Sequence, residues 1–237
     1  MSETNKTERY ERQIRLKEIG ADGQKKLKEA SVLVIGAGGI GCPLLSYLCA
    51  AGIGKIGIVD FDKVDISNLH RQVLYNEAQT GMYKSEAALE NLIKLNSETK
   101  FRVFNTSLGK SNGGNIIREF DIIADATDNL RSRYIINDLC LEKKKPLIWG
   151  AVNKFELQVS VFNFNGGADL RKLFPEINSD VNLKSCEEQG VTGPVPGMAA
   201  MLMSAEAIKI ITGCGVVMSN EMLIINMLSN DYRKIKF

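Results

Sequence analysis

The sequence is short of the residues that build most metal sites and disulfide frameworks. Its 237 residues include five cysteines and one histidine, and no two cysteines form a C-x-x-C pair. An odd number of scattered cysteines argues against a disulfide framework and against a four-cysteine zinc site. We therefore expect reduced thiols, a cytoplasmic location and no zinc. The single His70 likewise argues against histidine-based metal sites and catalytic triads.

An excess of charge of one sign is also missing. Thirty Lys and Arg against 28 Asp and Glu leave a net charge of +2, too balanced for a nucleic-acid footprint, and no polybasic run predicts a membrane-surface patch. Residues 1–15 are polar and lack the apolar core of a signal peptide. The longest weakly polar stretch, Val191–Ala205, is too short and too interrupted to span a bilayer. We expect no nucleic-acid and no membrane partner.

Short apolar runs alternate with amphipathic segments along the first two thirds of the chain. An amphipathic stretch covers Tyr10–Lys28, with interruptions near Gly20 and Gly23. The pattern then predicts strands at Ser31–Ile35, Lys55–Asp60, Phe101–Thr106, Asp121–Ala126 and Pro146–Val152, and helices at Cys42–Ala51, Lys84–Leu95, Gly114–Phe120 and Asn129–Lys143. This alternation is typical of an α/β fold with a Rossmann-like, open, mainly parallel sheet and helices on both faces.

The pattern changes in the last third of the chain. Glu156–Phe164 and Met222–Phe237 are predicted strands, which we expect to continue the sheet in antiparallel fashion. Between them lies a long polar segment, Asn165–Pro194, without clear periodicity, and a loop of that length is usually functional. Pro196–Thr212 is a predicted helix, with Gly213 near its carboxyl end.

A glycine-rich turn is the strongest local signal of function. Gly36, Gly38, Gly39 and Gly41 follow a predicted strand and open a predicted helix, as the G-x-G-x-x-G pattern requires. Glycines let backbone N–H groups approach a phosphate, and the helix amino terminus adds partial positive charge. Asp60 ends the next strand, where an acidic residue accepts hydrogen bonds from ribose hydroxyls. By itself this combination predicts a site for a dinucleotide cofactor.

Polar residues after Asp60 do not suit a nicotinamide oxidoreductase. The run contains Asp62, Asn68, Arg71, Gln72 and Lys84, and the two cations could reach a triphosphate. Taken singly, each of these two cations is better explained as a solvated surface charge. At the end of a later strand, Asp128 and Asn129 follow Asp125-Ala-Thr. Asp128 is placed to hold Mg²⁺, to cap the next helix, or both.

The combined motifs resemble the ThiF/MoeB/HesA family, the bacterial adenylyltransferases related to ubiquitin-activating enzymes. The matching pieces cover essentially the whole chain: Tyr10-Glu-Arg12-Gln-Ile14, the glycine turn, Val59-Asp-Phe-Asp62, Ser67-Asn-Leu-His-Arg71-Gln72, Lys84, Thr127-Asp-Asn129, Cys186-Glu-Glu-Gln-Gly190 and Ala205-Glu-Ala-Ile-Lys209. The resemblance implies one adenylation domain over residues 1–237. A nucleotide-binding part would occupy about 30–152, and a carrier-binding and crossover-loop part about 153–237.

The resemblance also implies the chemistry. The family uses ATP and Mg²⁺ to adenylate the C-terminal glycine carboxylate of a small β-grasp carrier that ends in Gly-Gly. Carried over to this sequence, the glycine turn would bind the nucleotide, Asp60 would bind the ribose, and Asp128 would hold Mg²⁺ as a catalytic residue. Asn68, Arg71 and Lys84 would contact the phosphates, with Arg71 and Lys84 catalytic. Asp62, Gln72 and Asn129 would also belong to the nucleotide site. Arg12 would reach the active site of the partner subunit in a homodimer, as a further catalytic residue.

Two features bear on the limits of this resemblance. Many members bind a structural zinc through two C-x-x-C pairs, but the segment from Gly166 to Pro175 has no cysteine, in line with the expected absence of zinc. Cys186 matches a cysteine that bonds covalently to the carrier in some members. It is therefore either a catalytic nucleophile or a small packing residue that adenylation does not need. The remaining cysteines, Cys42, Cys49, Cys140 and Cys214, are expected in the core.

The sequence leaves several functions open. A sulfur carrier for thiamine-thiazole synthesis is our first expectation, a molybdopterin-synthase carrier the second, and a peptide or another ubiquitin-like modifier the third. An inactive scaffold subunit of a heterodimeric activating enzyme is the non-enzymatic alternative. The retained cations and Asp128 argue against a scaffold, because a scaffold need not keep phosphate and metal ligands.

Overall fold

One mixed sheet organises the molecule. The computed structural model describes residues 8–175 and 190–237, and within them eight strands pair in the order β3-β2-β1-β4-β5-β6-β7-β8. Pairing is parallel from β3 to β5 and antiparallel from β5 to β8. The strands are β1 (Ser31–Ile35), β2 (Lys55–Val59), β3 (Lys100–Phe104), β4 (Ile122–Asp125), β5 (Leu147–Asn153), β6 (Glu156–Phe162), β7 (Glu221–Asn226) and β8 (Asp231–Lys236). The predicted fold class is confirmed.

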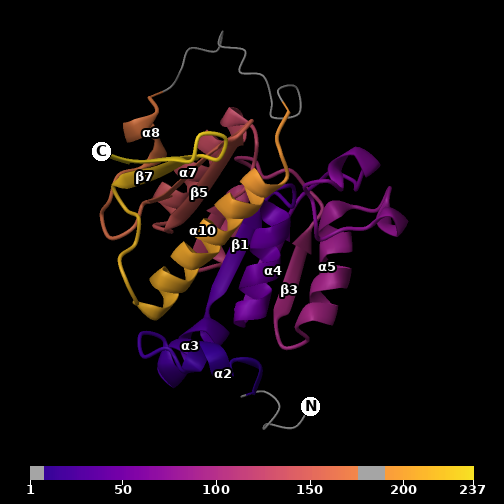
Figure 1. Ribbon diagram of the computed structural model, residues 1–237, viewed down its shortest axis with the longest axis horizontal. Coiled ribbons are helices and arrows are strands. Elements are labelled where there is room, and N and C mark those ends of the chain that lie inside the picture. The colour runs from indigo at the N-terminus through magenta and orange to yellow at the C-terminus, as the bar shows by residue number, and fades with distance from the viewer. Residues whose placement is uncertain (1–7, 176–189) are drawn as a thin grey trace.

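Helices cover both faces of the sheet (Figure 1). On one face lie α3 (Gly20–Glu29), α4 (Gly41–Ala51), α5 (Lys84–Leu95) and α10 (Pro194–Thr212); on the other lie α6 (Gly113–Arg118), α7 (Leu130–Glu142) and α8 (Leu170–Leu173). Side chains of a strand point alternately to its two faces. In β1, Val32 and Val34 therefore join the first core, and Leu33 and Ile35 join the second.

The amino-terminal segment differs from the prediction. The break in the amphipathic stretch falls at residues 15–19, between α2 (Glu11–Ile14) and α3, while Gly20 and Gly23 belong to α3. Gly23 packs closely there, because a Cβ on it would lie 2.9 Å from the Ile19 side chain. Figure 1 places α2 and α3 together at the lower end of the molecule.

The carboxyl-terminal third corrects two further expectations. Met222–Phe237 is not one strand but the hairpin β7–β8, because Asn226 accepts hydrogen bonds from the N–H groups of Leu228 and Ser229 and closes a turn. The polar segment 165–194 is not wholly irregular, since α8 lies within it and Asp169 caps that helix.

Helix α10 is longer and more apolar than the sequence pattern indicated. It runs for 19 residues and passes the length and hydropathy limits for a membrane span, which the shorter stretch Val191–Ala205 did not. Half of that window is buried inside the protein, where α10 packs against α4, α3, β5 and β6. This burial is typical of the core helix of a globular domain.

Candidate nucleotide-binding site

A cleft opens at the carboxyl ends of β1, β2 and β4. Strand β1 has β2 on one side and β4 on the other, so the chain order reverses there, and open α/β sheets bind ligands at such a point. The cleft encloses about 1050 Å³, including space open to solvent. It is lined by ten of the residues that the sequence singled out: Gly36, Gly38, Gly39, Asp60, Asp62, Arg71, Gln72, Lys84, Asp128 and Asn129.

The four motif glycines divide into two kinds. Gly38 and Gly39 face the cleft, and a Cβ on Gly38 would meet only the Gln72 amide nitrogen, at 3.8 Å. Gly36 has a φ of +94° and packs against the backbone of Ala126. Gly41 does not line the cleft; a Cβ there would lie 1.9 Å from the Gly36 carbonyl oxygen. Gly41 therefore has a packing reason to be glycine.

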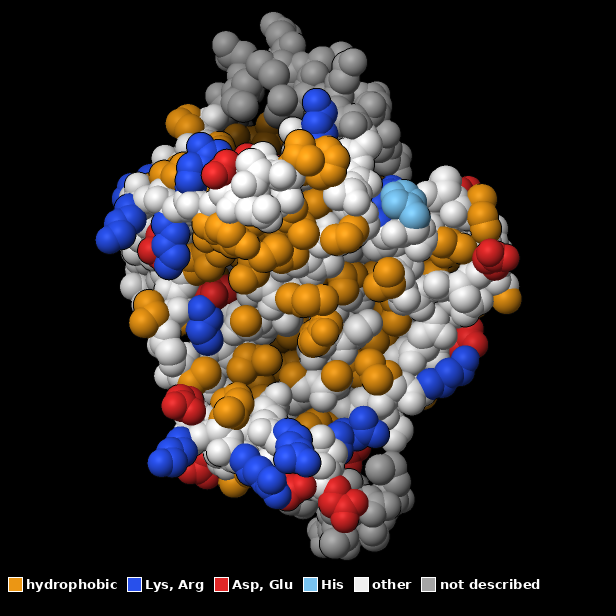
Figure 2. Space-filling model, in the orientation of Figure 1, with side chains coloured by type: hydrophobic (Ala, Val, Ile, Leu, Met, Phe, Trp, Pro, Cys, Tyr) orange, Lys and Arg blue, Asp and Glu red, His pale blue; other side chains and the backbone are white. Residues whose placement is uncertain are grey.

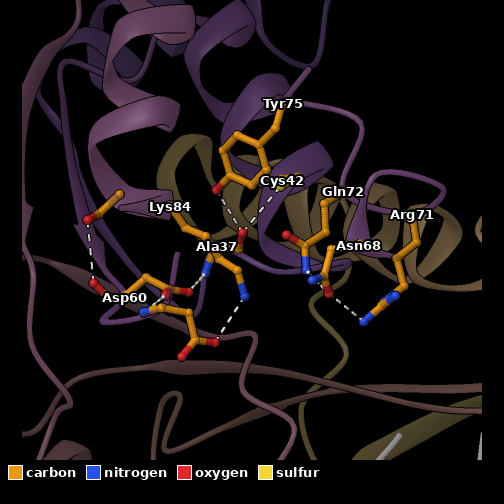
Figure 3. Close-up of polar contacts among 10 residues, drawn as sticks. Ala37, Cys42, Asp60, Asn68, Arg71, Gln72, Tyr75 and Lys84 are labelled. Carbon is orange, nitrogen blue, oxygen red and sulfur yellow. Dashed lines mark hydrogen bonds and ion pairs between the residues drawn. The ribbon is translucent and has the colours of Figure 1, made fainter. Parts of the chain in front are cut away.

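Side chains hold the glycine turn through Ala37 (Figure 3). The Ala37 N–H donates to the Asp60 carboxylate at 2.7 Å. Its carbonyl accepts a hydrogen bond from the Tyr75 hydroxyl at 2.8 Å and one from the Cys42 thiol at 3.3 Å. Burial raises the pKa of the Cys42 thiol to about 12 and also raises the pKa of Tyr75, so both groups stay protonated and act as donors. The turn is thus shaped before any ligand binds.

Asp60 combines a structural and a possible ligand role. Its other carboxylate oxygen accepts the Asp62 N–H at 2.8 Å. Burial raises the pKa of Asp60, while the hydrogen bond from Ala37 and the charge of Lys84 act in the opposite direction. Each carboxylate oxygen offers two lone pairs, so a ribose hydroxyl could still donate to Asp60.

The predicted cations lie in two groups. The buried Lys84 ammonium lies 2.9 Å from the half-exposed Asp62 carboxylate. Arg71 donates to the side-chain oxygen of Asn68 at 2.8 Å, and the Gln72 amide donates to the same oxygen at 3.1 Å. Asn68 is buried and does not line the cleft. Its place predicts that it orients Arg71 and Gln72 rather than contacting phosphate.

The loop after β4 assigns the helix cap, which the sequence analysis had left open for Asp128, to a different residue. Asn129, not Asp128, caps helix α7, because its side chain accepts the Ser132 N–H at 2.8 Å. Asp128 is exposed at the cleft, and no residue within 8–175 or 190–237 hydrogen-bonds its carboxylate. A carboxylate placed this way beside a phosphate-binding turn fits a Mg²⁺ ligand.

Two predicted catalytic residues lie elsewhere. Arg12 is exposed on α2, and its neighbours Tyr10 and Ile14 line a separate pocket with Gly52, which precedes β2. Helix α2 lies at the lower end of the molecule (Figure 1), by the amino end of β2, whereas the cleft of the same chain lies at the carboxyl ends of the strands. Cys186 falls outside the described residues, and its role stays a prediction.

The other residues that the sequence singled out are mostly structural. Cys42, Cys49 and Cys140 are buried as expected, whereas Cys214 is only partly buried. His70 is exposed, and its ring Nδ1 lies 3.0 Å from the Ser67 carbonyl oxygen. In the part of the chain that the structure describes, no group of three His, Cys, Asp or Glu side chains could hold a metal ion. The absence of zinc stays a prediction.

Sequence reasoning missed Arg133 and Asp125. Arg133 lines the cleft although only 9% of it is exposed, and Asp125 at the end of β4 is completely buried. The signal for Arg133 was available, because it shares the inward helical stripe of α7 with Ile136 and Cys140. A charged residue on a buried stripe indicates a polar partner at the sheet edge.

Comparison with known proteins identifies the family. A family model described as "ThiF family" matches residues 10–237. The chain belongs to the ThiF family. An "Adenylyltransferase and sulfurtransferase MOCS3" of Aedes aegypti is 43% identical over 232 residues, which are 98% of this chain and 53% of that protein. A "Probable molybdopterin-synthase adenylyltransferase" of Porphyra purpurea is 45% identical, over 96% of this chain and 60% of that protein. The chain thus spans only part of each ThiF-family relative.

Solved structures share the fold over the full length of this ThiF-family chain. The crystal structure of E. coli MccB with AMPCPP and SeMet MccA superposes with a TM-score of 0.84 at 25% identity, covering 100% of this chain and 73% of that one. The structure of PaaA superposes with a TM-score of 0.84 at 23% identity, covering 100% of this chain and 74% of that one.

Proposed function

We propose that this chain is an ATP-dependent adenylyltransferase that activates the C-terminal carboxylate of a small ubiquitin-like carrier protein. One observation carries the proposal: a single cleft gathers the glycine turn, Asp60, two cations and an uncommitted carboxylate, Asp128. Family membership and the names of the relatives support the same activity.

Different residues of the cleft would contact different parts of the nucleotide. The backbone of Gly38 and Gly39, at the amino end of α4, would contact phosphate oxygens, and Asp60 would accept the ribose hydroxyls. Lys84 and Arg71 would neutralise the triphosphate from the β2 side of the cleft. Asp128 would hold Mg²⁺ from the β4 side, and the ion would supply positive charge to offset that of the phosphates.

The reaction needs no protein nucleophile. An oxygen of the carrier carboxylate attacks the α-phosphorus, the bond from that phosphorus to the bridging oxygen breaks, and pyrophosphate leaves. Catalysis then consists of alignment and of charge stabilisation as negative charge moves onto the leaving group. The buried Lys84 is suited to this, because a charge held in a partly desolvated site interacts more strongly than one in water.

The identity of the carrier rests on the relatives. The name of the Porphyra protein favours a molybdopterin-synthase carrier, and we propose that class first. The thiamine-thiazole carrier expected from the sequence stays a prediction without support from these names. The third expectation from the sequence, a peptide or another ubiquitin-like modifier, also remains a proposal. One of the MccB structures contains MccA together with AMPCPP.

Pyrophosphate exchange tests the activity. We expect exchange of labelled pyrophosphate into ATP to require both Mg²⁺ and a carrier ending in Gly-Gly, and to fail with a carrier that lacks the tail. Asp128→Ala should abolish exchange and leave the fold intact, whereas Asp22→Ala, an exposed aspartate on α3 at the other sheet edge, should change nothing. Background exchange with every carrier class would favour the scaffold alternative. Binding of NAD in place of ATP would favour an oxidoreductase.

We further propose that the active form is a homodimer. The outward side of α10 carries an apolar stripe at helical spacing, formed by Met198, Met201, Leu202, Ala205 and Ile208, and Tyr47 on α4 extends it. Figure 2 shows hydrophobic side chains gathered over the middle of this face, with charged side chains toward its margins. A second copy of the chain is the occupant we propose. The chain's own Arg12 lies away from its cleft. In such a dimer we propose that Arg12 of each subunit reaches the cleft of the other, as the family resemblance implies.

Subunit complementation tests the shared site. Arg12→Ala and Asp128→Ala should each be inactive alone. After mixing in equal amounts and refolding, about half of the dimers should be mixed, and each of these has one site with both defects and one with neither. Activity should return to roughly a quarter of the wild-type level per chain by this symmetry. Demonstrated subunit exchange without recovery, or a monomer at assay concentration, would refute the shared site.

A further inference from the structure

The side chain of Arg133, on α7, contacts both the loop after β4 and strand β5 beneath the cleft. Its Nη2 donates to the Thr127 carbonyl at 2.7 Å and lies 3.3 Å from the Gly150 carbonyl of β5. Its guanidinium stacks over the Trp149 ring at 4.8 Å from the ring centre. A planar guanidinium with several fixed donors can brace backbone groups in this way, which a lysine cannot.

Asp125 holds the same loop from the other side. One of its carboxylate oxygens accepts both the N–H of Thr127, at 2.9 Å, and the Thr127 hydroxyl, at 2.7 Å. Burial raises the pKa of this carboxyl, and the charge of Arg133 is the largest effect that lowers it. Asp125 and Arg133 therefore balance each other's charge in a buried setting, where either one alone would be costly.

Three hydrogen bonds thus converge on Thr127, the residue directly before Asp128. The same loop touches the glycine turn, because a Cβ on Gly36 would lie 2.8 Å from the Ala126 carbonyl oxygen. Asp128 itself has no side-chain hydrogen bond to any described residue, so the backbone at Thr127 decides where its carboxylate points.

We propose that Arg133 and Asp125 are positioning residues that fix the Asp128 carboxylate relative to the phosphate-binding turn. The proposal rests on the proposed function, in which Asp128 holds the Mg²⁺ of the nucleotide complex. Residues behind a metal ligand typically alter metal affinity by 10- to 100-fold when they are changed, because a misdirected ligand binds weakly.

Metal activation separates positioning from general support of the fold. We expect Arg133→Gln and Asp125→Ala, which remove the hydrogen bonds to Thr127, to raise the Mg²⁺ concentration for half-maximal pyrophosphate exchange by about 10- to 100-fold. The KM for ATP at saturating Mg²⁺ should change by less than about threefold, since the glycine turn, Arg71 and Lys84 remain in place. Asp125→Asn keeps an oxygen for both Thr127 hydrogen bonds and should therefore retain most of the metal affinity. Arg133→Lys keeps the charge and should recover part of the loss. Arg131→Gln, an exposed arginine on the same helix, is the control.

A binding measurement without turnover accompanies the assay. The affinity of each protein for Mn²⁺ in the presence of ATP can be followed by electron paramagnetic resonance, with no carrier present. If Arg133→Gln or Asp125→Ala does not fold, the charge-preserving Arg133→Lys carries the test, because a lysine lacks the planar guanidinium and should still bind Mn²⁺ more weakly than the wild type. Weaker Mn²⁺ binding with unchanged ATP affinity supports positioning. Unchanged metal dependence, or an equal loss of ATP and metal binding, overturns it. An inactive wild-type enzyme that binds Mn²⁺ and ATP normally would count against the proposed function only.

Discussion

Replacing Gly41 by alanine should destabilise the fold, although its motif as a whole predicts nucleotide binding. A Cβ on Gly41 would lie 1.9 Å from the Gly36 carbonyl oxygen and 2.8 Å from the carbonyl carbon, where ordinary contact lies at 3.4–4 Å. Both obstructing atoms belong to the backbone, so no side-chain rotation relieves the overlap. The first turn of α4 has to move away from the glycine turn.

The magnitude follows from two opposing effects. Overpacking costs typically about 1–3 kcal/mol, whereas the higher helix propensity of alanine returns at most about 1 kcal/mol. Because the overlap is with backbone atoms, the overpacking cost should lie in the upper part of this range, at about 2–3 kcal/mol. Subtracting about 1 kcal/mol for helix propensity leaves a net loss in the free energy of unfolding of about 1–2 kcal/mol. In a domain of this size each kcal/mol lowers Tm by about 2–4 °C, which predicts a decrease of about 2–8 °C.

Gly38→Ala is the matched comparison. Its Cβ would meet only the Gln72 amide nitrogen, at 3.8 Å, and its φ lies outside the left-handed region, so the free energy of unfolding should stay within about 0.5 kcal/mol. The added methyl group instead occupies the surface where backbone N–H groups approach phosphate, so ATP affinity should fall at least about tenfold. Thermal unfolding by circular dichroism and ATP titration by calorimetry measure the two effects. A Gly41→Ala protein with the wild-type Tm, or equal destabilisation by the two variants, would refute this division of the motif.

Three further predictions concern stability. Arg171 donates two hydrogen bonds to Asp138 and lowers its pKa, so this partly exposed pair contributes about 0.5–1 kcal/mol above the unfolded pKa of 3.8. The difference between wild type and Asp138→Asn should be present at pH 7 and close as the pH falls below 3.8, as urea unfolding at several pH values can check. Glu206→Ala should cost about 1–3 kcal/mol, because the buried Met218 N–H loses its acceptor; equal urea midpoints would contradict this. Leu45→Ala, on the buried side of α4, should cost about 2–5 kcal/mol, and a smaller loss in denaturant unfolding would contradict this.

Local sequence patterns were sufficient for the framework of the fold. Strand β1 lies at Ser31–Ile35 as predicted, because a continuous apolar run bounded by a glycine turn has few alternatives in a buried sheet. The same holds for the glycine turn and Asp60, whose spacing places both at one sheet edge. The hairpin β7–β8 was missed although Asn226, Ser229 and Asn230 are turn formers, because the segments on both sides of the turn have a composition typical of strands.

Only the tertiary structure decided how the site residues share their roles. Asn129 and Asp128 are neighbours with equal capping ability, and the direction of the chain leaving β4 gives the cap to Asn129 and leaves Asp128 at the cleft. Arg133 lies in sequence like any helix arginine, yet it becomes a buried brace because β5 and Trp149 close over it. Hydrophobic periodicity indicates which side of a helix is buried, because the buried positions recur every three or four residues along the chain. The partner of a buried polar side chain cannot be predicted in this way, because it lies on a strand that is distant in the sequence and comes close only in the folded sheet.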